Sequence, residues 1–241
     1  MRVLLASIFC LVSISVLAQF KDQVRVQIFG LVRNQQLRET DTGGYFIGGE
    51  YTRRLNFGAT VLWDFEERWA VMLGVQKVSF VDDVNFWFRN GEIILLVRSN
   101  PYNGPAFLTG IERTLVQRSR WRLGSQARYQ FAVMDASQGG LSFGRAVNST
   151  QAIQIDYSAT KDVLKSNFHS LGLALYAHYR ISPRFWLVYE YSYMVALNRS
   201  PVVEMNVEYE VTTGGTTEQF TARTRANGTA RQHAIGLQFS F

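Results

Sequence analysis

The chain has 241 residues, of which 47% are hydrophobic, 14% aromatic and only 18% charged, a composition that excludes a disordered chain. Its formal net charge is +6, but the arginines are dispersed along the sequence instead of gathered in runs, which argues against a nucleic-acid-binding protein. The length allows one folded domain, and the pattern of the elements must decide its class.

Residues 1–18 have the pattern of a secretory signal peptide. A basic residue precedes an apolar run, and Val16 and Ala18 are small residues at the positions expected before a cleavage site. We expect cleavage after Ala18, which leaves residues 19–241 as a single exported domain. Because the only cysteine, Cys10, lies in the removed segment, we expect no disulfide or thiolate chemistry in the mature protein.

Apolar and polar residues alternate along most of the remaining chain. In residues 185–197 the odd positions are apolar or aromatic, and residues 24–28, 121–133 and 171–179 show the same period of two. The opposite face carries Gly, Ser, Gln and Arg, whereas the exposed face of a soluble sandwich favours Lys and Glu. The pattern therefore favours an antiparallel β-barrel with an apolar outer surface and a narrow polar lumen.

Turn signals predict the number of strands. Three short turns flanked by aromatic residues are typical of one end of a transmembrane barrel, and they lie at 64–68, 117–120 and 181–184. Four turn-forming sets suit the other end, at 41–44, 90–91, 148–150 and 214–215. These turns predict an all-β, transmembrane up-and-down antiparallel β-barrel of eight strands. A ten-stranded barrel, with a further turn at 53–56, remains open.

The predicted strands are long. A strand that spans a membrane needs about 9–11 residues, and these strands run to roughly twice that length. We expect residues 45–63 to form one strand, and one register to continue through the last hairpin and place residue 188 opposite residue 241. The outer halves should protrude into water and expose edges and aromatic side chains, namely Tyr45, Phe86, Phe88, Tyr102, Tyr157 and Phe220.

The last residues place apolar side chains at 235, 237, 239 and 241 and include Gly236. This segment resembles the C-terminal strand of bacterial outer-membrane β-barrel proteins, and the chain as a whole is similar to their small OmpX/OmpA-like class. The resemblance implies a location in the cell outer membrane. It also implies that Gly236, Phe239 and Phe241 are the assembly signal read by the barrel-assembly machinery.

An eight-stranded barrel is about wide enough for its own side chains. Charged residues in such a lumen must be paired, so we expect a polar network there, formed by Arg25, Glu112, Arg122, Arg128, Arg180 and Glu190. The favoured function is a non-enzymatic outer-membrane barrel with a filled lumen and a structural or surface-interaction role. Alternatives are a narrow channel or an accessory component of a transport or secretion system, and a lipid A-modifying enzyme.

No catalytic, cofactor-binding or metal-binding residues are predicted. The histidines, His169, His178 and His233, are scattered, and no Ser–His–acid spacing accompanies them. The expected partners are outer-membrane lipid or lipopolysaccharide, the assembly machinery and an extracellular protein, with no nucleic acid and a monomeric chain. Arginines near the membrane boundary either meet lipopolysaccharide phosphates or only solvate the rim, and both readings remain open for Arg53, Arg54, Arg199 and Arg231.

Overall fold

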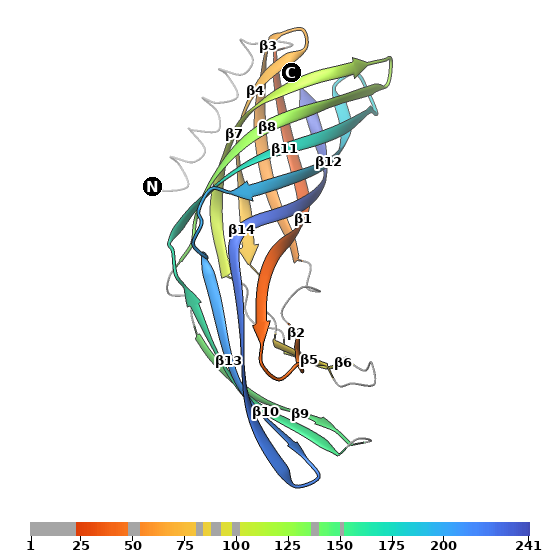
Figure 1. The fold of residues 1–241 in the computed structure, drawn as a ribbon. Coiled ribbons are helices and arrows are strands. Elements are labelled where there is room, and N and C mark those ends of the chain that lie inside the picture. Colours follow the sequence, from red (N-terminus) through yellow and green to blue (C-terminus); the bar gives the residue numbers. More distant parts are fainter. Residues whose placement is uncertain are drawn as a thin grey trace, which may run out of the picture.

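The computed structural model describes residues 23–47, 54–80, 84–87, 93–97, 102–135, 140–149 and 152–241. Eight antiparallel strands form a barrel, which closes because β1 pairs with β14 as well as with β3 (Figure 1). They are β1 (Val24–Asp41), β3 (Arg54–Glu66), β4 (Trp69–Phe80), β7 (Tyr102–Gln117), β8 (Trp121–Val133), β11 (Asn167–Arg180), β12 (Phe185–Ala196) and β14 (Thr216–Ser240).

The barrel confirms the prediction of eight strands. The three predicted short turns connect β3 to β4, β7 to β8 and β11 to β12, and we call their end of the barrel the inner end. The ten-stranded alternative is wrong, because β3 pairs with β1 without interruption from Arg54 to Trp63. The predicted signal peptide, residues 1–18, lies outside the described residues. No helix in the described part of the chain is long and apolar enough to span a membrane.

The remaining strands form a region beyond the barrel, at the end opposite to the short turns (Figure 1). β9 (Gly140–Asn148), β10 (Ile153–Val163) and β13 (Val203–Thr213) join residues 216–226 of β14 in the large sheet. β2 (Phe46–Ile47), β5 (Val84–Trp87) and β6 (Ile93–Val97) form a separate three-stranded sheet. We call these strands together, including residues 216–226, the outer extension.

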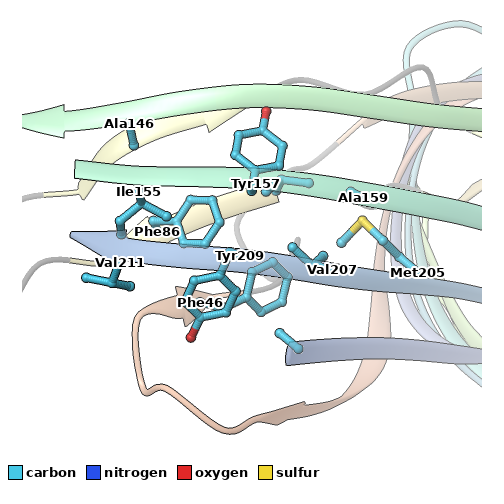
Figure 2. Packing of buried hydrophobic residues seen from close by; sticks show 12 residues of the cluster. Phe46, Phe86, Ala146, Ile155, Tyr157, Ala159, Met205, Val207, Tyr209 and Val211 are labelled. Carbon is cyan, nitrogen blue, oxygen red and sulfur yellow. The ribbon is translucent and has the colours of Figure 1, made fainter. Parts of the chain in front are cut away.

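An apolar core holds the two sheets of the outer extension together (Figure 2). Phe86 of β5 lies at its centre, with its ring 5.4 Å from that of Tyr157 and 5.2 Å from that of Tyr209. Phe46 approaches Phe86 from β2, with the two rings 5.9 Å apart. The prediction of exposed aromatic residues is therefore wrong for Phe86, Tyr102 and Tyr157, which are buried.

The other aromatic residues of that prediction differ in outcome. Tyr45 and Phe220 are partly buried against the core of the outer extension, and Phe88 lies outside the described residues. The sequence pattern is compatible with exposure because period two shows which residues share a face, and does not show whether a second sheet covers that face.

The first predicted outer hairpin is also wrong in part. Residues 45–63 do not form one strand, because β2 leaves the barrel wall and pairs with β5, while β3 begins at Arg54. The turn at Asp41 explains the departure: its carboxylate accepts hydrogen bonds from the backbone N–H of Gly43 and of Phe46, at 3.1 and 2.9 Å. These bonds redirect the chain across the outer extension. The predicted turn at 90–91 lies outside the described residues.

The last hairpin keeps its predicted turn but not its predicted register. Thr213 pairs with Thr216 across Gly214 and Gly215, as expected. Val188, however, pairs with Gly236 and not with Phe241. Two irregularities separate the registers: the link from β12 to β13 contains Pro201, which has no N–H for a ladder bond, and β14 bulges at Gly228, whose φ is 101°.

Candidate functional site

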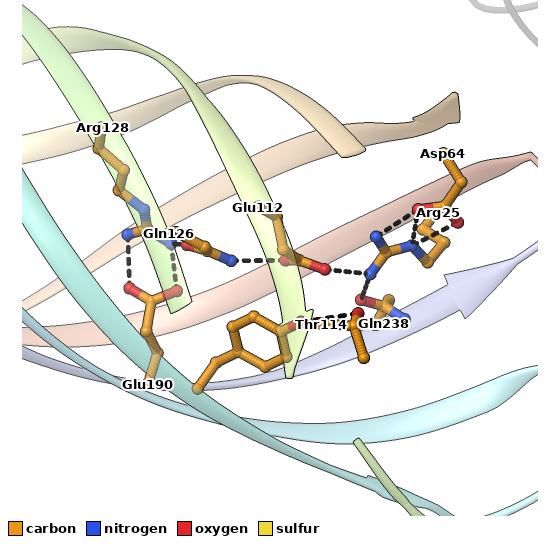
Figure 3. Close-up of polar contacts among 9 residues, drawn as sticks. Arg25, Asp64, Glu112, Thr114, Gln126, Arg128, Glu190 and Gln238 are labelled. Carbon is orange, nitrogen blue, oxygen red and sulfur yellow. Dashed lines mark hydrogen bonds and ion pairs between the residues drawn. The ribbon is translucent and has the colours of Figure 1, made fainter. Parts of the chain in front are cut away.

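Arg25 organises the inner half of the lumen (Figure 3). Its guanidinium binds Asp64 at 2.6 Å and Glu112 at 2.8 Å, and it donates a further hydrogen bond of 3.3 Å to Gln238. Asp64 is expected only as a turn residue from the sequence, because its contact with Arg25 depends on the pairing of β1 with β3. These bonds connect β1, β3, β7 and β14 across the interior.

A second ion pair lies further along the lumen. Gln126 donates a hydrogen bond of 2.7 Å to Glu112 and accepts one from Arg128. Arg128 also forms a bidentate ion pair with Glu190 (Figure 3). All four side chains are buried. Two arginines and two glutamates are thus joined through one glutamine. Charges buried in a medium of low dielectric constant are tolerated only when they are paired and hydrogen-bonded in this way.

Arg122 and Arg180 do not join this ion-paired network. The Arg122 guanidinium lies 5.0 Å from the ring centroid of Trp186, and that of Arg180 lies 5.8 Å from the same centroid, near the inner end. Arg122 is half-buried, while Arg180 is exposed. Both residues therefore cover Trp186 as cation–π partners, and neither has an ion pair with a described carboxylate.

Apolar residues fill the outer end of the lumen. Phe80, Tyr102, Met134, Phe168 and Val202 are each at most 2% exposed and belong to one cluster. The buried guanidinium of Arg33 stands over the rings of Phe80 and Phe168, at 5.1 and 5.7 Å, and donates a 2.6 Å hydrogen bond to the carbonyl of Gly228. The lumen thus passes from an ion-paired segment to an apolar segment.

The histidines do not assemble a catalytic site with the described residues. His169 bonds Tyr129, and His233 bonds Tyr189 at 3.0 Å, both on the outer surface of the barrel. His178 is buried in the lumen against Tyr176, with the rings 4.4 Å apart. No group of three His, Cys, Asp or Glu residues suited to a metal ion occurs in the described part of the chain.

The C-terminal residues contribute to closure of the barrel. A side chain at Gly236 would place its Cβ 2.3 Å from the carbonyl oxygen of Ile28, so only glycine fits at this crossing of β14 and β1. The ring of Phe239 lies 5.0 Å from that of Phe185, and the backbone N–H of Phe241 donates to the carbonyl of Val24 at 3.2 Å. Recognition of these residues by an assembly machinery stays a prediction.

The edge of the large sheet carries a surface that the sequence analysis did not single out. β9 is the last strand in the sheet order, and it exposes Leu141, Phe143 and Val147, at 59%, 71% and 53%. We call these three residues the edge stripe. The alternating apolar residues at 141, 143 and 147 are a signal in the sequence that could have located it.

A hollow of about 780 Å³ adjoins the edge stripe, and Phe143 is part of its lining. The carboxylates of Asp156, Glu208 and Glu210 also belong to this lining. A hydrogen bond from Arg145 to Asp156, at 2.6 Å, holds the pKa of that carboxyl below its ordinary value. The edge of the outer extension therefore combines an apolar stripe with a row of negative charge.

Comparison of the chain with protein-family models and with curated proteins finds no match. Among solved structures, it is similar to the outer membrane protein OprG from Pseudomonas aeruginosa, with 9% identity, a TM-score of 0.48, and 92% of this chain and 97% of that chain covered. It is also similar to the N-terminal β-barrel domain of OprF from the same organism, with 8% identity, a TM-score of 0.47 and coverages of 92% and 98%. For the outer membrane protease OmpT from Escherichia coli the values are 10%, 0.42, 91% and 97%. Each of these similarities concerns the fold alone.

Proposed function

We propose that the chain is a non-enzymatic barrel of the outer membrane, whose lumen is filled by its own side chains and whose outer extension binds another protein. The location is supported by the outer surface of the barrel, where large apolar residues are exposed on successive strands. Examples are Ile28, Phe57, Leu73, Phe107, Leu173, Leu187 and Leu237, each at least 44% exposed. Such a belt is typical of a barrel in lipid, because contact between so much apolar surface and water would be unfavourable.

The contacts among the side chains inside the barrel carry the proposal. An ion path needs room for hydrated ions and charged side chains that are free to move. Here the charged side chains are fixed by ion pairs and hydrogen bonds, namely those of Arg25, Glu112, Arg128 and Glu190. Beyond them, the apolar cluster around Phe80 and Phe168 occupies the outer end of the lumen, with both rings fully buried. Two successive segments of different chemistry therefore oppose passage of ions.

The lumen is tested by conductance of the purified full chain in planar bilayers. We expect no steady current. The double variant Phe80→Ala/Phe168→Ala removes two rings of the apolar segment. It tests whether this segment blocks the passage of ions. Steady large currents from the unmodified protein would contradict a filled lumen and favour the narrow-channel alternative.

The binding role is supported by the edge stripe. Among the described residues β9 is hydrogen-bonded as a strand to β10 alone, and the other edge of such a strand offers backbone N–H and C=O groups that can pair with an added strand. Soluble parts of a protein seldom leave three large apolar residues exposed on such an edge, because the edge then associates with other chains. The neighbouring carboxylates favour an extended partner segment that carries both apolar and basic residues.

The binding role is tested by site-specific photo-crosslinking on intact cells. A photoreactive residue at 143 should give a discrete protein adduct, whereas one at Thr217, in the part of β14 that belongs to the outer extension, should not. With the photoreactive residue at 147, the variant Phe143→Ser should lose most of the adduct. The control variant Glu218→Gln, with the photoreactive residue at the same position, should retain it. Equal adducts at both positions, or none at all, would contradict a specific partner on β9.

A further inference from the structure

Four arginines line one small pocket where the barrel meets the outer extension. The pocket has a volume of about 320 Å³ and is formed by three segments: β1, the link from β12 to β13, and β14. Its lining consists of Arg38, Thr40, Arg199, Pro201, Arg223, Arg225 and Asn227. We call this site the arginine pocket. Arg38, Arg199, Arg223 and Arg225 are all exposed, so the guanidinium groups are accessible from outside.

The positive charge of the arginine pocket is only partly balanced. Glu204 binds Arg225 at 2.5 Å and Arg223 at 3.4 Å. Burial opposes ionisation of Glu204, but the hydrogen bonds from Arg225 and Asn206 and the charges of both arginines hold its pKa below the ordinary value. Glu204 therefore makes ion pairs with two of the four guanidinium groups. No ion pair of Arg38 or Arg199 occurs with a carboxylate in the described residues.

The strand register makes this gathering of charge unfavourable for the free protein. Arg38 and Arg225 are directly opposite each other in the β1–β14 ladder. Like charges in that position are destabilising in a sheet. An anion bound between them would remove the repulsion, and a phosphate group suits guanidinium groups because it accepts two parallel hydrogen bonds from each.

The height of the pocket identifies the kind of anion. Arg199 follows Leu197 by two positions, and Leu197 is an exposed apolar residue directly after the end of β12. The pocket thus lies at the upper boundary of the apolar belt. Further out along the same sheet the charge reverses, where Glu208 and Glu210 line the hollow beside the edge stripe. A soluble polyanion would meet these carboxylates, whereas a headgroup at the lipid surface would meet four arginines that are balanced only in part by Glu204.

We propose that the arginine pocket binds the phosphate groups of lipopolysaccharide, through its lipid A headgroup, in the outer leaflet. This inference rests on the proposed location in the outer membrane. It assigns to Arg38, Arg199, Arg223 and Arg225 a specific lipid contact, in place of general solvation of the rim. Glu204 is a positioning residue, because its ion pairs orient Arg223 and Arg225 from the neighbouring strand β13.

The test uses the full chain in phosphatidylcholine nanodiscs, with binding of bis-phosphorylated lipid A measured by native mass spectrometry. The variant Arg38→Gln/Arg199→Gln removes two charges that have no ion pair with a described carboxylate. We expect lipid A binding to weaken by about tenfold or more, since hydrogen bonds between charged groups are among the strong ones. The control Arg118→Gln/Arg120→Gln removes the same charge at the turn between β7 and β8 and should leave binding within about twofold, the range of a surface substitution.

The outcomes separate the inference from the proposed location. Failure of the unmodified chain to insert into nanodiscs as a β-sheet protein would overturn both. Insertion without lipid A binding, an equal loss in the control variant, or equal binding of dephosphorylated lipid A would overturn the arginine pocket alone. Binding of heparin in place of lipid A would also overturn it, because the ligand would then be a soluble polyanion. A selective loss in the Arg38/Arg199 variant that depends on the phosphates supports the inference.

Discussion

The barrel and the outer extension bury opposite kinds of side chains, although they share the long strand β14. In the barrel, ion pairs such as Arg128–Glu190 lie inside and apolar residues such as Leu187 face outward. In the outer extension, Val207 and Tyr209 lie inside, and Glu208 and Glu210 face outward. One region is arranged for an apolar surrounding and the other for water, so the boundary between them marks the expected edge of the lipid.

The link between β12 and β13 produces this reversal. Odd-numbered residues of β12, such as Val195, face outward, whereas odd-numbered residues of β13, such as Val203, are buried. Eight residues (195–202) separate Met194 from Val203, but only three (227–229) separate their partners on β14, Ala230 and Ala226. Since the difference of five is odd, the same alternating series turns its apolar face from the outside to the inside.

β9 does not undergo this reversal. Even-numbered residues are buried both in β8, as with Ala132, and in β9, as with Ala146. The odd-numbered apolar residues therefore lie on the outside in both strands, and those of β9 form the edge stripe. An outward face suited to lipid is thus retained in a region otherwise arranged for water, which is why we assign a partner to it.

The largest effect is expected from breaking the ionic interior of the barrel. Glu190→Ala leaves Arg128 buried without its ion pair, and we expect the free energy of unfolding to fall by about 4 kcal/mol. Urea unfolding of the full chain in lipid vesicles measures this change. The control Glu208→Gln alters an exposed carboxylate and should change stability by at most about 0.5 kcal/mol. Equal effects in the two variants would contradict the ion-paired lumen.

A somewhat smaller and more local effect is expected in the outer extension. Ile155→Ala removes a fully buried side chain from the core shared by the two sheets. We expect a loss of about 3 kcal/mol, confined to the outer extension because the barrel wall closes without these contacts. Limited proteolysis should then cleave the outer extension while the barrel keeps its resistance. Leu173→Ala, on the exposed surface of the barrel, is the matched control, and simultaneous loss of both regions would contradict their independence.

The sequence predicts the barrel well, because its evidence is local. Alternation and short turns establish eight strands, and the same alternation places Arg25, Glu112, Arg128 and Glu190 on the inner face. It does not establish which of them pair. The partners depend on register, and β7 already shifts register between Thr114 and Val116. Asp64 enters the network only through such pairing, so no motif in the sequence marks it.

The outer extension is harder to predict, for two physical reasons. The face that Val203 and Val207 present depends on an odd difference in length between two links, and the alternating pattern is identical for either face. The core also requires a second sheet, in which Phe46 and Phe86 come from strands of two and four residues. Such short segments carry too little periodicity to be recognised. Pro201 does indicate that the strand is interrupted, because proline has no N–H for a ladder bond, but it does not indicate which face the following strand buries.

A pH dependence should distinguish the core of the outer extension from its surface. Burial, and then the 2.7 Å hydrogen bond that Tyr209 donates to Asp41, raise the pKa of this phenol above its ordinary value. Above pH of about 10 the unfolded chain loses the proton while the folded chain retains it, so the free energy of unfolding should fall, by up to about 1.4 kcal/mol per pH unit. Tyr209→Phe should lessen this slope, whereas Val211→Ala, which changes the same core without removing a phenol, should leave it unchanged. An identical slope in both variants would mean that Tyr209 titrates as a solvated phenol.

The smallest effect is expected from an ion pair that repeats the chemistry of the lumen at an exposed position. Arg145 binds Asp156 at 2.6 Å, but the two side chains are 62% and 37% exposed. Exposed pairs contribute only about 0.2–1 kcal/mol, because water already solvates both groups and salt screens their attraction. Arg145→Gln should therefore change the urea midpoint slightly, and less in high salt, while Glu190→Ala should keep its full effect at every salt concentration. Comparable losses from the two substitutions would show that burial is not what separates the lumen from the outer surface, and the contrast between the two regions would then need another cause.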